Sequence, residues 1–241
     1  MFHNPQKPEP KAEIGSGMID MHSMFFTIQG EGPYSGHSAI FIRLAGCNLQ
    51  CPGCDTEYTE GRVEMPVTEV YNQFRDMVEE NNTPNVLAVI TGGEPLRQDI
   101  DALVSILLLN GHPVQIESNG VFEVSEVLKQ FLRARRLMLV VSPKTSRINP
   151  VTAEYATVFK YVLHADYIAE DGLPTQALYH PTGRANKVAR PPQGARKPIY
   201  ITPFDERDPE QNRRHLNAVA ICTMAYGYIG GIQLHKLIGI D

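Results

Sequence analysis

The chain has 241 residues, of which 42% are hydrophobic and 20% charged, and its formal net charge is −5. These values are typical of a globular protein with one sizeable core, and they give no sign of a nucleic-acid partner. No apolar run reaches the roughly 20 residues that a membrane-spanning helix needs. Residues 1–22 contain charges and prolines without an apolar signal core, so we expect a flexible leader. A single core domain is then expected over residues 23–241.

Strands and helices alternate along most of the predicted core. Alternation of apolar residues predicts a strand at 38–44, and apolar residues at helical spacing predict a helix from 67 to about 82. The same patterns then repeat. We expect further strands at 86–91, 113–117, 137–141 and 157–163, and further helices at 100–107, where Gly111 would form the cap, and at 124–132.

The C-terminal third is less regular. Residues 165–197 contain several prolines and glycines, which predicts a long irregular excursion. Strand character returns at 198–202, and Asp208 followed by Pro209 is typical of a helix start. A last short strand is expected at 232–235.

This order predicts an α/β fold with a mostly parallel sheet. Polar or glycine-rich clusters follow four consecutive predicted strands of the core. Enzymes with parallel sheets place their chemistry at the carboxyl ends of the strands. The four clusters are therefore expected to surround one site. They are the cysteine loop 47–54, Gly92-Gly93, Ser118-Asn119-Gly120 and Ser142-Pro143-Lys144.

The cysteine loop spaces Cys47, Cys51 and Cys54 as C-x3-C-x2-C. Thiolates are soft ligands that select zinc, copper or iron–sulfur clusters, and clustered cysteines of this kind are typical of the reducing cytoplasm. A closed zinc site needs a fourth ligand, which would have to be His37 or another histidine. Three thiolates on a [4Fe–4S] cluster instead leave one iron open for a bound molecule. Cys222 is distant in the sequence and is expected to be an inert core thiol.

The cysteine spacing after a first strand resembles the radical S-adenosylmethionine superfamily, which implies a partial (β/α) barrel. In that superfamily the open iron binds S-adenosylmethionine, and the reduced cluster releases a 5′-deoxyadenosyl radical from it. Thr91-Gly92-Gly93-Glu94-Pro95 matches the glycine–glycine–glutamate motif that approaches the methionine amino group. Glycine allows this approach because it has no β-carbon.

Residues 26–32 (FTIQGEG), together with Arg43, Asp55 and Thr56, closely resemble the 7-carboxy-7-deazaguanine synthases of this superfamily. The resemblance runs from about residue 25 to the C-terminus and is strongest over the first third. It implies a lyase that converts 6-carboxy-5,6,7,8-tetrahydropterin to 7-carboxy-7-deazaguanine with release of ammonia, in the pathway to queuosine in tRNA. It also implies a homodimer and an electron donor such as flavodoxin or ferredoxin.

The resemblance assigns roles by position. The cluster would be bound by Cys47, Cys51 and Cys54, and Mg²⁺ by Thr56. S-adenosylmethionine would contact Gly53, Cys54, Asp55, Gly93, Ser118, Asn119, Ser142, Pro143, Lys144, Thr202, Pro203, Phe204 and Asp205. The pterin would contact Ile28, Gln29, Gly30, Arg43, Thr91, Glu117, His235 and Asp241. No side chain is carried over as an acid or base.

Some of these positions have alternative interpretations. Arg43 can bind a carboxylate through two parallel hydrogen bonds, or it can form a surface salt bridge on an edge strand. His235 can equally be a core histidine. Thr202 stands where the family commonly has glutamine, which weakens the expectation of a side-chain contact there.

Two other functions compete with the synthase. A glycyl-radical-enzyme activating protein would share the cysteine loop, but such proteins lack the combination of Gln29, Arg43 and the segment 233–236. A non-catalytic iron–sulfur or zinc module would use the cysteines alone. The four polar strand ends argue against so simple a role.

Overall fold

The computed structural model describes residues 3–13, 17–185 and 187–240, and its strands form one sheet in the order β3-β1-β2-β4-β5-β6-β7-β8-β9. The strands from β2 to β9 run parallel, whereas β1 pairs antiparallel with both β2 and β3. The strands are β1 Met18–Ile28, β2 Ser38–Leu44, β3 Val63–Pro66, β4 Leu87–Gly92, β5 Val114–Ser118, β6 Leu137–Val141, β7 Val158–Leu163, β8 Ile199–Pro203 and β9 Ile229–Gly230.

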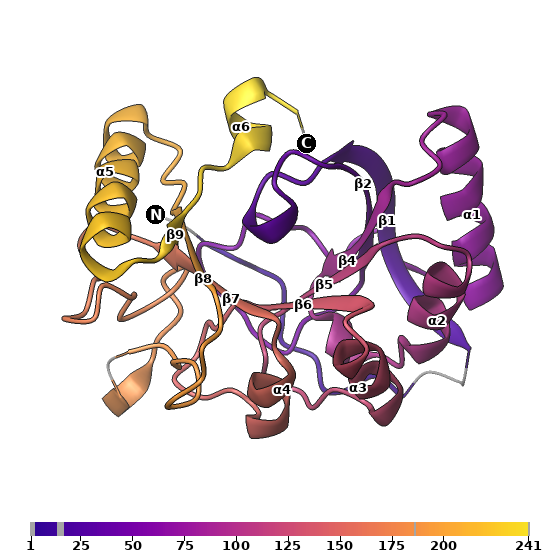
Figure 1. The fold of residues 1–241 in the computed structure, drawn as a ribbon, viewed down its shortest axis with the longest axis horizontal. Helices are drawn as coiled ribbons and strands as arrows, with labels where there is room; N and C mark the ends of the chain where they lie inside the picture. The colour runs from indigo at the N-terminus through magenta and orange to yellow at the C-terminus, as the bar shows by residue number, and fades with distance from the viewer. Residues whose placement is uncertain (1–2, 14–16, 186, 241) are drawn as a thin grey trace.

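The helices lie mainly outside the curve of this sheet (Figure 1). They are α1 Val67–Glu80, α2 Asp101–Leu109, α3 Glu126–Arg133, α4 Pro150–Tyr155, α5 Pro209–Tyr226 and α6 Leu234–Ile238, with 3-10 turns η1 Gly32–Tyr34, η2 Pro95–Arg97 and η3 Gly183–Ala185. The sheet does not close, because β3 and β9 are its two edges. The expected α/β fold with a mostly parallel, incomplete barrel is confirmed. No helix in the described parts of the chain is both long and apolar enough to cross a membrane.

The two faces of the sheet have different roles. Ile40, Ile42 and Leu44 of β2 are fully buried in the core between the sheet and the helices. Side chains alternate along a strand, so Phe41 and Arg43 point to the inner face. Arg43 is there in register with Thr91 of β4. The alternation thus directs the functional positions of β2 into the barrel.

Helix α5 has a capping residue at each of its two ends. Asp208 caps α5 by accepting a hydrogen bond from the Gln211 N–H at 2.9 Å, and Pro209 occupies the first turn, as the sequence predicted. Gly227, with φ of 71°, ends the same helix in the left-handed conformation that glycine adopts without strain.

Two predictions about the ends of the core are wrong. Residues 18–22 belong to β1, and Asn4 and Gln6 in the expected leader are buried. The strand expected at 232–235 is absent, since β9 lies earlier in the chain and α6 begins at Leu234. Elements β1, β3 and α4 had no counterpart in the sequence prediction. Residues 165–197 are irregular as expected, with the short turn η3 and two isolated bridges.

Candidate active site

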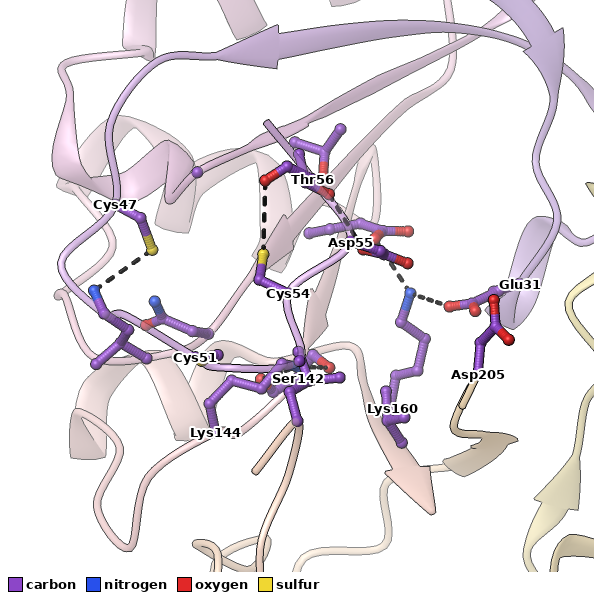
Figure 2. A pocket seen from close by; sticks show the side chains of 18 of the residues that line it. Glu31, Cys47, Cys51, Cys54, Asp55, Thr56, Ser142, Lys144, Lys160 and Asp205 are labelled. Carbon is purple, nitrogen blue, oxygen red and sulfur yellow. Dashed lines mark hydrogen bonds and ion pairs between the residues drawn. The ribbon is translucent and has the colours of Figure 1, made fainter. Parts of the chain in front are cut away.

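The cysteine loop follows β2 and lines a cavity at the carboxyl ends of the strands (Figure 2). Cys47, Cys51 and Cys54 all contribute to the wall of this cavity and form no disulfide. Burial raises the pKa of the Cys47 and Cys51 thiols to about 12. Buried thiolates therefore need a positive centre beside them, which an iron cluster supplies. The donor set fits a three-thiolate cluster.

Among the described residues of the cavity wall, no histidine or fourth cysteine is available for the zinc alternative. Cys222 is buried in the core on α5, as expected for an inert thiol. His37 is exposed beside η1, donates from Nδ1 to the Tyr34 carbonyl at 3.0 Å, and is not part of the cavity wall. The described residues that line this wall include no histidine.

The glycine strand end packs directly against the cysteine loop. A β-carbon on Gly93 would lie 1.9 Å from the Gly46 carbonyl oxygen, so only glycine fits there. The next residue, Glu94, is buried and receives three hydrogen bonds. They come from Ser118 Oγ at 2.7 Å, the Asn119 N–H at 2.7 Å and the Leu96 N–H at 3.0 Å. Burial acts to raise the pKa of Glu94, and these donors oppose it.

Most positions that the resemblance assigned to S-adenosylmethionine line this first cavity. They are Gly53, Cys54, Asp55, Gly93, Ser118, Asn119, Ser142, Lys144, Phe204 and Asp205. Pro143, Thr202 and Pro203 do not line it. Thr202 is fully buried within β8, and its hydroxyl has no hydrogen-bond partner. At the position where the family commonly has glutamine, the Thr202 side chain therefore does not reach the cavity wall.

A second cavity adjoins the first. Its wall includes Ile28, Gln29, Arg43, Thr91, Glu117 and His235, which the resemblance assigned to the pterin, and also Thr56. Both cavities share Glu31, Asp55, Thr56, Thr91, Glu117, Lys160 and Gln233. The cysteine loop and the expected pterin positions therefore face one continuous site.

Arg43 lies on an interior strand, because β2 is hydrogen-bonded to β1 on one side and β4 on the other. The edge-strand interpretation of Arg43 is wrong. Its guanidinium lies 4.7 Å from the centre of the Phe25 ring, and Phe25 stacks on Phe41 at 5.4 Å. This contact holds the cation against the aromatic wall of the second cavity.

Gly30 packs directly against His235 in the C-terminal segment. A β-carbon on Gly30 would lie 1.9 Å from His235 Nδ1, so the absence of a side chain admits the imidazole. The Leu234 N–H donates to the Gly30 carbonyl at 3.1 Å. His235 therefore lines the site instead of the core, and Gly30 contributes by making room. Asp241 lies outside the described residues.

One buried lysine organises the polar residues between the two cavities. Lys160 Nζ lies 2.7 Å from Glu31 Oε2 and 3.1 Å from Glu117 Oε2 (Figure 2). Gln233 Nε2 donates to the other Glu31 oxygen at 2.7 Å, and Gln29 Nε2 donates to Glu117 at 3.0 Å. Burial alone would raise the pKa of Glu31, but Lys160 and Gln233 hold it at about 2. Lys160 thus keeps Glu31 ionised at neutral pH and lies between the two carboxyl groups.

A cluster of His164, Glu206 and His215 lies behind this wall, with one possible ligand atom of each within 4.8 Å of the others. The backbone N–H of Asp166 donates to His164 Nδ1, and that of Ala165 donates to His215 Nδ1. Each neutral imidazole therefore carries its proton on Nε2, which is the atom nearest Glu206. His164 Nε2 lies 3.1 Å from the Tyr179 hydroxyl, whereas His215 Nε2 has no hydrogen-bond partner among the described residues, and neither Nδ1 is free to bind a metal ion.

Comparison with known proteins agrees with this geometry. Residues 41–151 match the model of the radical SAM superfamily. The 7-carboxy-7-deazaguanine synthase of Rhodospirillum rubrum is 37% identical, with 98% of each chain covered. The chain belongs to the 7-carboxy-7-deazaguanine synthase family. The synthase of Rickettsia prowazekii is 29% identical over 96% of this chain and 94% of its own. The crystal structure of QueE from Escherichia coli matches with a TM-score of 0.63 at 21% identity, covering 90% of this chain and 95% of that one, and supports the fold.

Family membership does not by itself point to Lys160 or Glu31, and neither residue has a role predicted from the sequence. Lys160 is the one charged residue in the strand Val158–Leu163, and such a lysine is rarely buried without a partner. That pattern could have marked it. Gln233 and Lys236 were noted only as parts of a motif. The structure places Lys236 Nζ 3.3 Å from Asp55 and 3.0 Å from Asp205, so α6 is tied to the cavity wall.

Proposed function

We propose that this protein is a radical S-adenosylmethionine lyase that converts 6-carboxy-5,6,7,8-tetrahydropterin to 7-carboxy-7-deazaguanine with release of ammonia. The single observation that carries the proposal is the wall shared by the two cavities, with three cysteines on one side and Arg43 on the other. A cluster module or electron carrier has no use for the second cavity. A site that acts on a protein partner has no use for the buried charges within it.

The substrate roles follow from the chemistry of the second cavity. Arg43 binds the pterin carboxylate through two charge-assisted hydrogen bonds. Glu117 and Gln29 accept and donate along the aminopyrimidine edge, already held in place by their mutual hydrogen bond of 3.0 Å. Thr91 lies beside Arg43 in the strand register and lines both cavities. Ile28 and His235 complete the wall around the ring.

The cofactor roles belong to the first cavity. When bound, the [4Fe–4S] cluster and S-adenosylmethionine supply a 5′-deoxyadenosyl radical. The protein's part is to bind, orient and exclude water. Gly93, whose neighbourhood admits no side chain, lets the backbone approach the methionine group. Ser142 accepts a hydrogen bond from Lys144 Nζ at 2.6 Å, which fixes the lysine beside the cysteine loop.

Thr56 is proposed as a Mg²⁺ ligand. It lines both cavities, and its hydroxyl donates to Asp55 Oδ1 at 3.3 Å. Hydroxyl, carboxylate and substrate oxygens are hard ligands of the kind that Mg²⁺ prefers.

We further propose a homodimer in the cytoplasm, reduced by a flavodoxin or ferredoxin. Leu216, Ile221 and Met224 of α5 are exposed large apolar residues, which supports burial of this helix against another subunit. A cluster held by three thiolates requires a reducing compartment and a one-electron donor.

The decisive experiment is anaerobic reconstitution. The cluster is rebuilt, reduced and mixed with S-adenosylmethionine, Mg²⁺ and the carboxytetrahydropterin, and the products are separated by chromatography. We expect 5′-deoxyadenosine and the carboxydeazaguanine together. Formation of 5′-deoxyadenosine without a deazaguanine would exclude this substrate, and failure to bind a [4Fe–4S] cluster would exclude the radical chemistry as well.

A further inference from the structure

The segment of residues 3–13 is packed against the cysteine loop. Asn4 and Gln6 are only 6% and 8% exposed, whereas Pro5 and Lys7 beside them are exposed. Polar side chains are rarely buried to this degree unless hydrogen bonds compensate. The alternation therefore identifies an extended segment with a polar inner side, and its partners lie in the loop.

The first contacts hold the loop around two cysteines. Asn4 Nδ2 donates to the Cys51 carbonyl at 3.1 Å, and Gln50 Nε2 donates back to the Asn4 carbonyl at 2.8 Å. The Glu9 N–H donates to the Cys47 carbonyl at 2.7 Å. The backbone positions of Cys47 and Cys51 are thus fixed from outside the loop.

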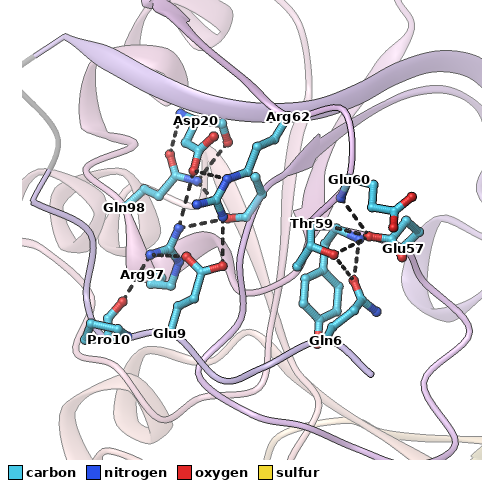
Figure 3. Close-up of polar contacts among 12 residues, drawn as sticks. Gln6, Glu9, Pro10, Asp20, Glu57, Thr59, Glu60, Arg62, Arg97 and Gln98 are labelled. Carbon is cyan, nitrogen blue, oxygen red and sulfur yellow. Dashed lines mark hydrogen bonds and ion pairs between the residues drawn. The ribbon is translucent and has the colours of Figure 1, made fainter. Parts of the chain in front are cut away.

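Gln6 holds the far end of the same loop with both ends of its amide. Its Nε2 donates to the Thr56 carbonyl at 2.9 Å, and its Oε1 accepts the Tyr58 N–H at 2.7 Å. Figure 3 shows this amide reaching toward residues 57–60. The Tyr58 hydroxyl in turn donates to the Leu49 carbonyl at 3.3 Å. One side chain therefore satisfies a backbone acceptor and a backbone donor just after Cys54.

Arg97 anchors the segment at its other end (Figure 3). This arginine is 4% exposed, and its guanidinium donates to the carbonyls of Pro10 and Ala45, each at 3.1 Å. The Ala12 N–H donates to the Arg97 carbonyl at 2.8 Å, and the Glu9 carboxylate lies 3.4 Å from Nη1. The cation therefore joins the segment to the end of β2, just before the cysteine loop.

We propose that residues 4–12 are a positioning strap that fixes the cysteine loop in the geometry needed to retain the cluster. The inference rests on the [4Fe–4S] cluster of the proposed function. A cluster bound by three thiolates has no fourth protein ligand, so its retention depends on how rigidly those three are held. The strap supplies this rigidity because it bonds to the carbonyls of Cys47 and Cys51 and to the backbone of the segment that follows Cys54. Asn4 and Gln6 are its positioning residues.

The test measures iron release. Wild type and the variants Asn4→Ala, Gln6→Ala and Asn4→Ala/Gln6→Ala are reconstituted anaerobically and mixed with bathophenanthroline disulfonate. Lys7→Ala, on the exposed side of the same segment, is the matched control. Loss of the three hydrogen bonds between these two side chains and the loop backbone predicts iron release about tenfold or more faster in the double variant. The electron paramagnetic resonance signal of its reduced cluster should also change shape. Lys7→Ala should match wild type.

A second variant and a second measurement separate positioning from general stability. Gln6→Glu keeps the acceptor for the Tyr58 N–H but places a second carboxylate oxygen against the Thr56 carbonyl, so its iron release should be at least as fast as that of Gln6→Ala. The thermal midpoint of the cluster-free chain should change little. Iron release equal to that of wild type would overturn the strap proposal. Faster release accompanied by a lower thermal midpoint of the cluster-free chain would overturn it as well, and neither result would affect the cluster assignment. A wild type that binds no cluster would overturn the cluster assignment together with the strap.

Discussion

Glu31 and Lys160 form a buried ion pair of 2.7 Å across 129 positions of the sequence. The pair joins the segment after β1 to the inner face of β7, and Glu117 on β5 shares the same ammonium at 3.1 Å. It lies in the wall common to both cavities. The charge balance at the centre of the site therefore depends on one lysine.

Lys160→Met tests this dependence. Removing the cation leaves two carboxylates in a buried site, and breaking a buried pair in this way costs about 3–5 kcal/mol of unfolding free energy. Urea unfolding measures the loss. Adding Glu31→Gln to Lys160→Met removes one of the unpaired charges and should restore part of the stability. A double variant no more stable than the single one would contradict this account.

Glu31 also predicts a stability change with acid. Its pKa lies at about 2, below the ordinary 4.5, so the folded state favours the charged form. The stabilisation is present above about pH 4.5 and is lost as the pH falls toward 2, amounting to about 3 kcal/mol. Glu31→Gln should flatten the acid limb of stability between these values. Chemical unfolding at several pH values measures it, and an unchanged acid limb would be inconsistent with the pairing.

Arg43→Ala should weaken pterin binding and leave the cluster spectrum unchanged. A charge-assisted hydrogen bond contributes about 1.5–3 kcal/mol, so KM should rise roughly 10- to 150-fold. The matched control is Arg75→Ala, which removes an exposed arginine that pairs with Asp76 on α1. Normal substrate affinity in Arg43→Ala would show that the carboxylate binds elsewhere.

Two glycine variants should affect the two cavities separately. In Gly93→Ala the new methyl group would meet backbone of Gly46, so we expect the cysteine loop to shift and the cluster content to fall. In Gly30→Ala it would meet the side chain of His235, which can move, so α6 should be displaced while the cluster remains. Iron content and KM for the pterin measure the two effects. Equal cluster loss in both variants would contradict the separation.

Thr56→Val tests the proposed Mg²⁺ site. Valine keeps the shape and removes the hydroxyl ligand, so more Mg²⁺ should be needed for half-maximal product formation. Chelation of Mg²⁺ should lower wild-type turnover, and it should leave the iron content unchanged. A variant with the Mg²⁺ dependence of wild type would rule out Thr56 as a ligand.

The sequence predicted well the parts of the fold that depend on local pattern. The bounds of β2 and β6 are those predicted, because short apolar strands are bordered by polar residues. The strand predicted at 232–235 failed because a short apolar run fits either a strand or a helix turn. The Gly231 N–H bonds to Ile201 and the Gln233 side chain bonds to Glu31, and these tertiary contacts decide its path.

In the site, too, the features that depend on local sequence pattern could be predicted, and those that depend on distant contacts could not. Three thiols within eight residues are a local signal, and the four polar strand ends could be placed together from topology alone. The partners of Lys160 and Gln6 could not be identified in this way, because they lie 129 and about 50 positions away. Nothing in the residues 3–13 themselves reveals that Asn4 and Gln6 are buried. Their burial follows from unpaired backbone groups in the loop they cover.

The bond between Gln233 and Glu31 spans 202 positions and has a consequence for biosynthesis. A ribosome makes Glu31, the cysteine loop and all the parallel strands up to β8 before it adds Gln233 and Lys236. Until then the pocket lacks the α6 segment that ties Asp55 to Asp205. The contacts that close this side of the pocket are therefore the last that translation makes possible.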